Sequence, residues 1–286
     1  ESGKRKFRLS WLPQNNGKKA DDLSQKAGTF HHVHAWRQHE ERRNMKQHPS
    51  LECTEHRPWP LPEKNWRWCQ QWQNLVFIHW SIDKDWLQKQ LPSGLELDLY
   101  DGQAWIGIVP FSMKGVTLRG CPAPRFLCDF PEINLRTYVT RNGKKGVWFF
   151  SLDVPNALAV WAARTFFHLP YYNARINTTE HEHQVNYHSV RNEVEFDGTY
   201  IPEKFIDATG NSFESWSTER YCLYSVNSQG RLFRGDIHHK RWPLQSASIE
   251  IRKNTFLNDM PIGDMHPSVL FSRSIDVVVY DLVRDD

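Results

Sequence analysis

Residues 163–175, ARTFFHLPYYNAR, bring together several side chains that could take part in chemistry. Arg164 could hold a carboxylate through two parallel hydrogen bonds, and Tyr171 and Tyr172 could donate hydrogen bonds to a developing oxyanion. His168 could act as a general base. The stretch contains no lysine, cysteine or carboxylate, so it offers no nucleophile of its own. It is either part of an active site that lacks a nucleophile or an aromatic segment of the core.

A second polar pattern lies in residues 130–138, FPEINLRTY. Because successive side chains of a strand point to opposite faces, Glu132, Asn134, Arg136 and Tyr138 share one face of a strand here. Four such side chains indicate either a wet outer surface or the lining of a polar cavity, and the pattern favours neither. In a cavity, Glu132 would be a catalytic candidate, and Asn134 and Arg136 would be ligand-binding candidates.

Other kinds of site find little support in the sequence. It contains no GxxxxGK[ST], GxGxxG or GxSxG motif, and its five cysteines lack CxxC spacing, which favours reduced thiols. His181 and His183 would share a strand face, as two metal ligands do, but His188 has the opposite parity. A solvated strand face is therefore favoured over a metal site. We predict neither a metal nor a cofactor.

The composition of the chain changes near residue 55. Residues 1–55 hold 11 Lys/Arg and 7 Asp/Glu, whereas the rest of the chain holds 25 and 26. We predict a basic, disordered extension over 1–55 and one folded domain over 56–286. The extension could touch nucleic acid weakly, but a solvated tail is favoured, and the charge balance of the domain gives no reason to expect nucleic acid.

The sequence also bears on where the protein resides. No apolar run is long enough to span a bilayer, and the first residues do not resemble a signal peptide. We therefore expect a cytoplasmic protein without a membrane partner. The sequence begins at Glu1 rather than Met, so an upstream segment could be missing.

The elements that must position these residues are mostly short strands separated by Gly and Pro. Helices are predicted over 83–90, with Asp83 as the N-cap, and over 157–167. The sequence RNGKKG at 141–146 predicts a hairpin turn. The order of elements indicates an α+β fold dominated by antiparallel sheet, without βαβ alternation, that closes into a single barrel or cone.

Several motifs together resemble the YqjF-like family of uncharacterised bacterial proteins. They include RPWPLP, WQNLVFIHW, LPSGLELD, FPEINLRTYV, GVWFFSLD, LPYYNAR and TERYCLY, and they cover most of the chain beyond residue 57. That family is similar in turn to the acetoacetate decarboxylase superfamily. This resemblance implies an antiparallel β-cone with a few short helices.

The resemblance also implies that the catalytic lysine of the decarboxylases is missing from this chain. In the decarboxylases, a lysine that follows a proline forms a Schiff base with a β-keto acid, and its neighbours help to lower its pKa. The matching positions here are Tyr171 and Tyr172, and a phenol cannot form an iminium. Lys144 and Lys145 lie in the predicted exposed turn and are poor substitutes. Arg164 and Glu132 match an arginine and a pocket carboxylate of the superfamily.

The resulting hypothesis is a small-molecule-binding protein or a non-Schiff-base enzyme acting on a small carbonyl or carboxylate compound. If it is an enzyme, it is a lyase or an isomerase, with Glu132, Tyr171, Tyr172 and His168 as catalytic candidates. Arg164, with Asn134 and Arg136, would bind the ligand. The alternatives are a decarboxylase with a displaced lysine, a non-catalytic interaction module with a basic tail, and a merely structural Arg164–Glu132 ion pair. A homo-oligomer is compatible with each of them.

Overall fold

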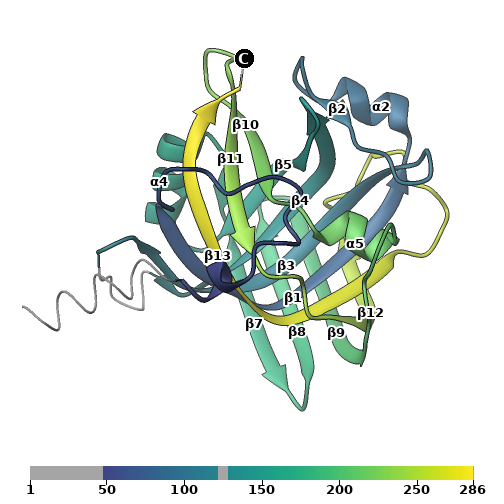
Figure 1. Cartoon of the computed structure of the whole chain (residues 1–286). Coiled ribbons are helices and arrows are strands. Elements are labelled where there is room, and N and C mark those ends of the chain that lie inside the picture. The colour runs from purple at the N-terminus through teal and green to yellow at the C-terminus, as the bar shows by residue number, and fades with distance from the viewer. Residues whose placement is uncertain (1–47, 122–127, 286) are drawn as a thin grey trace, which may run out of the picture. The chain divides into compact units, whose positions relative to one another are not determined.

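The computed structural model describes residues 48–121 and 128–285. Most of the predicted extension, residues 1–47, therefore lies outside the described residues. Figure 1 shows a mainly β structure with few short helices. The strands are β1 (Trp68–Ile82), β2 (Glu96–Leu97), β3 (Ala104–Leu118), β4 (Phe130–Arg141), β5 (Lys144–Val154), β6 (Tyr171–Asn173), β7 (Arg175–His181), β8 (Gln184–Arg191), β9 (Val194–Phe205), β10 (Cys222–Val226), β11 (Leu232–His239), β12 (Leu244–Asn254) and β13 (Ser268–Arg284). The helices are η1 (Pro49–Glu52), α2 (Lys84–Lys89), α4 (Ala157–Phe167) and α5 (Phe213–Thr218).

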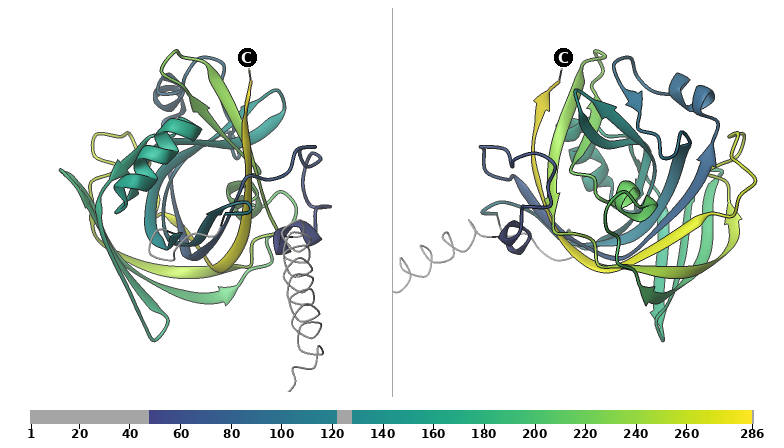
Figure 2. Two further views of the ribbon diagram at one scale, coloured as in Figure 1. Left: turned by 90° about the vertical axis from the view of Figure 1, so that its left-hand side faces the viewer. Right: turned by 45° about the vertical axis from the view of Figure 1, so that its right-hand side comes forward.

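Seven strands close into a barrel. They pair in the order β1, β3, β4, β5, β10, β11 and β13, and β13 pairs with β1 again to complete the circle. All of these pairings are antiparallel except that of β5 with β10. Figure 2 shows the barrel strands curving around a common axis, with α4 at one end and α5 at the other.

A second sheet branches from the barrel at β13. The first part of β13 pairs with β12, and β9, β8 and β7 follow in order, whereas its later part pairs with β11. Strand β1 bends in its middle, where Asn74 has a φ of +50° and the register with β3 shifts. Asparagine tolerates this left-handed conformation better than most residues.

The side chains of each barrel strand divide between two apolar layers, as strand alternation requires. Leu75 and Phe77 of β1 point into the barrel, whereas Val76 and Ile78 pack in a second cluster with residues of β8 and β9. The inner face of β4 carries the polar residues of the predicted pattern. The fold therefore buries a polar row inside a mainly apolar barrel.

The predicted α+β fold dominated by antiparallel sheet is confirmed. The helix at 157–167 and the hairpin turn at Asn142-Gly143 form as predicted, and Asp83 caps α2 by accepting a hydrogen bond from the Trp86 amide. The described strands show no βαβ alternation, as predicted, but they include one βαβ unit that the sequence did not indicate, because β5 and β6 are parallel and α4 connects them. The unit was missed because β6 is only three residues long.

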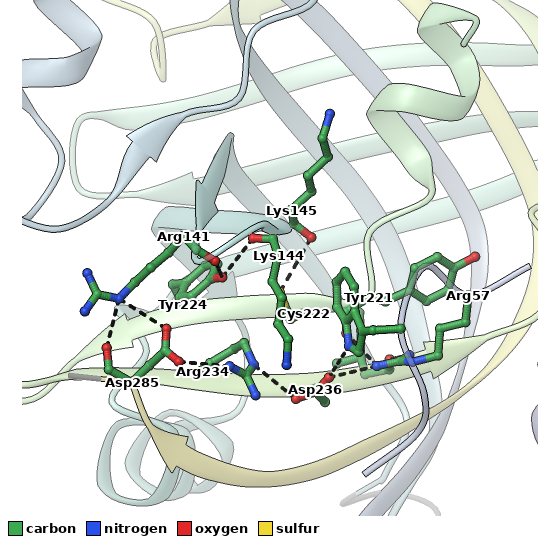
Figure 3. Close-up of polar contacts among 12 residues, drawn as sticks. Arg57, Arg141, Lys144, Lys145, Tyr221, Cys222, Tyr224, Arg234, Asp236 and Asp285 are labelled. Carbon is green, nitrogen blue, oxygen red and sulfur yellow. Dashed lines mark hydrogen bonds and ion pairs between the residues drawn. The ribbon is translucent and has the colours of Figure 1, made fainter. Parts of the chain in front are cut away.

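Residues 48–67 form a strap on the outside of the barrel. In this strap η1 packs on β11 and β13, and its Ser50 carbonyl contacts Nε2 of His238 at 2.8 Å. Arg57 donates to Asp236 at 2.8 Å, and this pair begins a chain of alternating charges. Figure 3 shows the chain passing through Arg234 and Asp285 to Arg141 at the end of β4. These contacts tie the strap to three barrel strands.

Candidate functional site

The barrel encloses a chamber of about 90 Å³. Most of its lining is apolar, but eight side chains with polar groups, besides the indoles of Trp72 and Trp242, also line it. They are Gln70, Glu132, Asn134, Arg136, Tyr171, Thr218, Arg220 and His239. The polar face of β4 therefore lines a cavity, which settles the choice that the sequence left open.

Glu132 is buried in this chamber and is held by two hydrogen bonds. The Tyr171 hydroxyl donates to its Oε2 at 2.8 Å, and the Asn134 amide donates to its Oε1 at 3.2 Å. No described cation pairs with it. Burial raises the pKa of Glu132 from 4.5 to about 7, although the two hydrogen bonds oppose the rise and the nearby Asp153 adds to it.

Tyr171 reaches Glu132 because of the way α4 ends. His168 takes a left-handed conformation, φ +54°, at the C-cap of α4, and after Pro170 the chain forms the short strand β6 beside β5. Alternation along β6 points Tyr171 into the chamber and Tyr172 away from it. Burial and the adjacent Glu132 raise the pKa of Tyr171, so its phenol stays protonated and serves as a donor.

Arg136 is a buried cation without a carboxylate partner among the described residues. Its guanidinium lies 5.1 Å from the Phe77 ring and 5.5 Å from the Tyr138 ring, and it donates to the Tyr138 hydroxyl at 3.3 Å. Its Nε and the Oδ1 of Asn134 are buried with no hydrogen-bond partner in the described structure. A buried guanidinium with an unused N–H group is able to donate hydrogen bonds to a carboxylate.

Four polar residues of the chamber were not predicted from the sequence: Gln70, Thr218, Arg220 and His239. Arg220 is buried, pairs with Asp98 and keeps its Nη2 without a hydrogen-bond partner among the described residues. His239 is also buried, which lowers its pKa below the usual value and favours the neutral ring. Arg220 lies within TERYCLY, one of the motifs that identified the family, but a lone arginine or histidine gives no sign of facing inward.

Three predicted site residues lie outside the chamber. Arg164 is exposed, donates from Nε to the Tyr171 carbonyl and stacks at 5.1 Å on the Tyr172 ring. The other face of Tyr172 is covered by Arg191 at 4.2 Å. His168 packs against Phe233.

The alternative of a structural Arg164–Glu132 ion pair was therefore wrong. The resemblance to the superfamily suggested that Arg164 and Glu132 share one pocket, but the end of α4 turns Arg164 outward, and strand alternation turns Tyr172 outward.

A second chamber of about 270 Å³ lies under α4. Six residues, among them Gln70, Leu169 and Tyr171, line both chambers, so the two spaces adjoin. The opposite end of the barrel is filled by α5, whose Phe213 lies 4.5 Å from the Trp105 ring and whose Trp216 lies 4.6 Å from the Tyr138 ring. The adjoining outer chamber gives the inner chamber a route toward solvent beneath α4.

No lysine of the described part of the chain lines either chamber. Lys144 and Lys145 open β5, as the predicted turn placed them. Lys145 is mostly exposed and pairs with Asp98 at 3.1 Å, and the ammonium of Lys144 lies 5.6 Å from the Trp59 ring. Neither is available inside the barrel.

The histidines of the β7–β8 hairpin do not form a site. His181 and His183 are exposed, and His188 contacts Glu195 at 3.2 Å. Among the described residues there is no group of three or more His, Cys, Asp or Glu side chains placed to hold a metal. In the same residues no helix is both long enough and apolar enough to cross a membrane.

Comparisons by sequence agree with the predicted family. The sequence model of DUF2071, a family of uncharacterised conserved proteins, matches residues 69–276. The uncharacterised protein YqjF of Bacillus subtilis strain 168 is 39% identical over 228 residues, which cover 78% of this chain and 94% of YqjF. The predicted resemblance to YqjF-like proteins is confirmed.

Comparisons by structure confirm the predicted fold. Acetoacetate decarboxylase from Legionella pneumophila matches with a TM-score of 0.58 at 16% identity, covering 84% of this chain and 98% of the enzyme. The enduracididine biosynthesis enzyme MppR, complexed with pyruvate, matches with a TM-score of 0.58 at 12% identity, covering 80% and 93%. An acetoacetate decarboxylase-like enzyme from Sphingomonas wittichii RW1 matches with a TM-score of 0.55 at 13% identity, covering 81% and 98%. At such low sequence identities the structural similarity establishes the fold alone. Any function has to be inferred from the residues of the site.

Proposed function

The chain belongs to the DUF2071 family and has an acetoacetate decarboxylase-like fold, and from that premise we propose that its barrel binds a small oxo carboxylate. We further propose that it moves a proton at the carbon next to the carbonyl without forming a Schiff base. The observation that carries the proposal is the Glu132–Tyr171 hydrogen bond in a chamber that also holds the unpaired Arg136.

Four polar groups of the chamber have a part in this reaction. The carboxylate of the ligand binds Arg136 and Asn134 in the deep part of the chamber. When the ligand binds, Tyr171 turns its single O–H from Glu132 to the carbonyl oxygen and stabilises the charge that develops there. Glu132 takes the proton from the carbon next to the carbonyl, and the enolate regains a proton from Glu132 at that same carbon. No bond between ligand and protein is needed.

The pKa of Glu132 suits this role. A general base works best when its pKa lies near the working pH, and burial brings this carboxyl to about 7. An ordinary exposed glutamate would be ionised at neutral pH but too weak a base for a carbon acid. The raised pKa therefore supports Glu132 as the base.

We also propose that Tyr171 occupies the place of the Schiff-base lysine of the decarboxylases. It follows Pro170, as that lysine follows its proline, and it points into the chamber toward Glu132. MppR, which shares the fold, was obtained with pyruvate, so the fold admits a 2-oxo acid. The absence of a chamber lysine among the described residues speaks against the alternative of a decarboxylase with a displaced lysine.

The test is hydrogen–deuterium exchange at the methyl group of pyruvate in D2O, followed by proton NMR. The wild-type protein should accelerate exchange above the buffer rate. Glu132→Gln should lower the accelerated rate by about a hundredfold or more, since it removes the base. Tyr171→Phe should lower it by a smaller factor, and Tyr172→Phe, whose ring lies outside the chamber, should leave it unchanged.

Two results would reject the proposal. If the methyl protons of pyruvate exchange no faster than in buffer, at concentrations where pyruvate saturates the protein, the proposed proton transfer is rejected. Trapping of a pyruvate adduct on a lysine with borohydride would reject the mechanism without a Schiff base. Release of CO2 from acetoacetate with such an adduct would favour the displaced-lysine decarboxylase.

A further inference from the structure

The chamber under α4 differs in chemistry from the inner chamber. Its walls are formed by apolar side chains of β1, β3, β4 and α4, among them Trp68, Met113, Val116 and Phe130. Among the described residues that line it, Gln70, Asn156 and Tyr171 supply the polar side-chain atoms, besides the Trp68 indole nitrogen. Two of these are already engaged, since Asn156 caps α4 and Tyr171 donates to Glu132. The outer chamber therefore offers little to a charged or polar group.

One face of α4 gives the outer chamber its width. Ala159, Ala162 and Ala163 line it, and Phe167 follows one turn later, so the spacing of three and four residues places them on one side of the helix. None of the α4 residues is buried, although this face is apolar. Small side chains here leave open a space that larger ones would fill. An apolar wall facing such a space is stabilised when an apolar group displaces the water.

The position of the outer chamber relates it to the ligand. The residues shared by both chambers, including Gln70 and Tyr171, stand at the junction between the polar and the apolar space. A head group bound to Arg136 and Glu132 would direct the rest of its molecule past Tyr171 and under α4. Leu158 lines the outer chamber and is 57% exposed, so the space opens to solvent beside it.

We propose that the ligand is amphipathic, with an oxo carboxylate head in the inner chamber and an unbranched apolar tail of several carbons in the chamber under α4. This inference rests on the proposed function for the binding of the head group. It adds the class of ligand: a 2-oxo acid longer than pyruvate rather than pyruvate itself. The tail binds by apolar burial, and α4 sets the length that can be accommodated.

The experiment is isothermal titration of the whole chain with a series of unbranched 2-oxo acids, from pyruvate through 2-oxohexanoate to 2-oxooctanoate, each below its aggregation concentration. Burial of a methylene group tightens binding by about fourfold. The dissociation constant should therefore fall by about fourfold for each added carbon until the outer chamber is full, with a stoichiometry of one. The number of carbons at which the affinity stops increasing measures the length of tail that the outer chamber accommodates.

Two variants of α4 test where the tail lies. Ala162→Leu fills part of the outer chamber and should abolish the gain with chain length, so that its dissociation constants for pyruvate and for 2-oxooctanoate differ little. Ala157→Leu is the matched control, because Ala157 is exposed on the same helix and does not line the chamber. It should retain the wild-type series. Circular dichroism and tryptophan fluorescence of both variants confirm that the fold is intact.

The outcomes separate this inference from the proposed function. Binding of pyruvate with no gain along the series overturns the inference and leaves the proposed function standing. A gain that survives unchanged in Ala162→Leu also overturns it, because the tail then lies elsewhere. Failure of every acid, pyruvate included, to bind refutes the proposed function and this inference with it.

Discussion

Replacement of Glu132 by glutamine should stabilise the protein at neutral pH and above. Burial raises the pKa of this carboxyl from 4.5 to about 7, so ionising it costs more free energy in the folded chain than in the unfolded chain. One pKa unit corresponds to about 1.4 kcal/mol, and the rise therefore corresponds to about 3 kcal/mol. Glutamine cannot ionise and avoids this cost.

The dependence on pH follows from the two protonation states. Below pH 4.5 the carboxyl is protonated in both the folded and the unfolded chain, and the wild-type protein has no penalty. As the pH rises, the unfolded chain loses its proton first, and the stability of the wild type falls until the folded carboxyl has also ionised, above pH 7. The free energy of unfolding of Glu132→Gln minus that of the wild type should therefore grow by about 3 kcal/mol between pH 4.5 and pH 8.

The surroundings of Glu132 can accept the amide. The Tyr171 hydroxyl can donate to the new amide oxygen as it donates to the carboxylate. The Oδ1 of Asn134 has no partner in the described structure, so a turn of that side chain lets it accept from the new amide nitrogen. The substitution therefore leaves no additional buried polar atom unpaired, and the comparison isolates the charge.

The assay is urea unfolding followed by tryptophan fluorescence at several pH values from 4.5 to 8, for both proteins in the same buffers. The wild type and Glu132→Gln have all other titrating groups in common, so the contributions of those groups cancel when the two free energies of unfolding are subtracted. Glu96→Gln, at an exposed carboxylate on β2, is the control and should follow the wild type throughout. A difference between Glu132→Gln and the wild type that stays flat from pH 4.5 to 8 would refute the reasoning.

Further predictions concern the neighbouring groups. Tyr171→Phe removes a hydrogen bond that lowers the pKa of Glu132, so the pH profile of pyruvate exchange should move to higher pH, as NMR rates would show. Arg136→Met should weaken pyruvate binding by about tenfold or more, since it removes a charged hydrogen-bond donor, and calorimetry measures this. Asp236→Asn should lower the free energy of unfolding by about 3 kcal/mol in urea titrations, because it leaves the buried Arg57 without its partner (Figure 3). Cys222, whose pKa burial raises to about 12, should resist thiol reagents in the folded protein, whereas the exposed Cys121 reacts.

The fold could be predicted from sequence because its signals are local. The alternation of β4, the Asn-Gly turn and the Asp83 cap each follow from a few neighbouring residues, and the motifs added the family. The parallel pairing of β6 with β5 could not be predicted, because three residues carry no periodicity and the pairing depends on where α4 lies.

The site could be predicted only in part, for a related reason. Glu132, Asn134 and Arg136 share a strand face by alternation, but whether that face is inside depends on closure of the barrel by strands distant in sequence. Tyr171 and Tyr172 are indistinguishable by type, and only the direction of β6 separates them. Arg220 enters from the segment between α5 and β10, and His239 from the end of β11, and nothing near them in sequence indicates which way they face.

The cost of Glu132 bears on whether the chamber is functional. At neutral pH this carboxylate lowers the free energy of unfolding by about 3 kcal/mol. That is a large fraction of the roughly 5–15 kcal/mol by which domains are typically stable. Among the described residues it forms no ion pair that would offset this cost, and an amide could make the same hydrogen bonds. The buried Arg136 adds a second charge without a carboxylate partner in the described structure, lining the same chamber. A purely structural core has no use for two uncompensated charges. A ligand whose carboxylate binds Arg136 and whose acidic C–H group faces Glu132 would give both charged residues a partner.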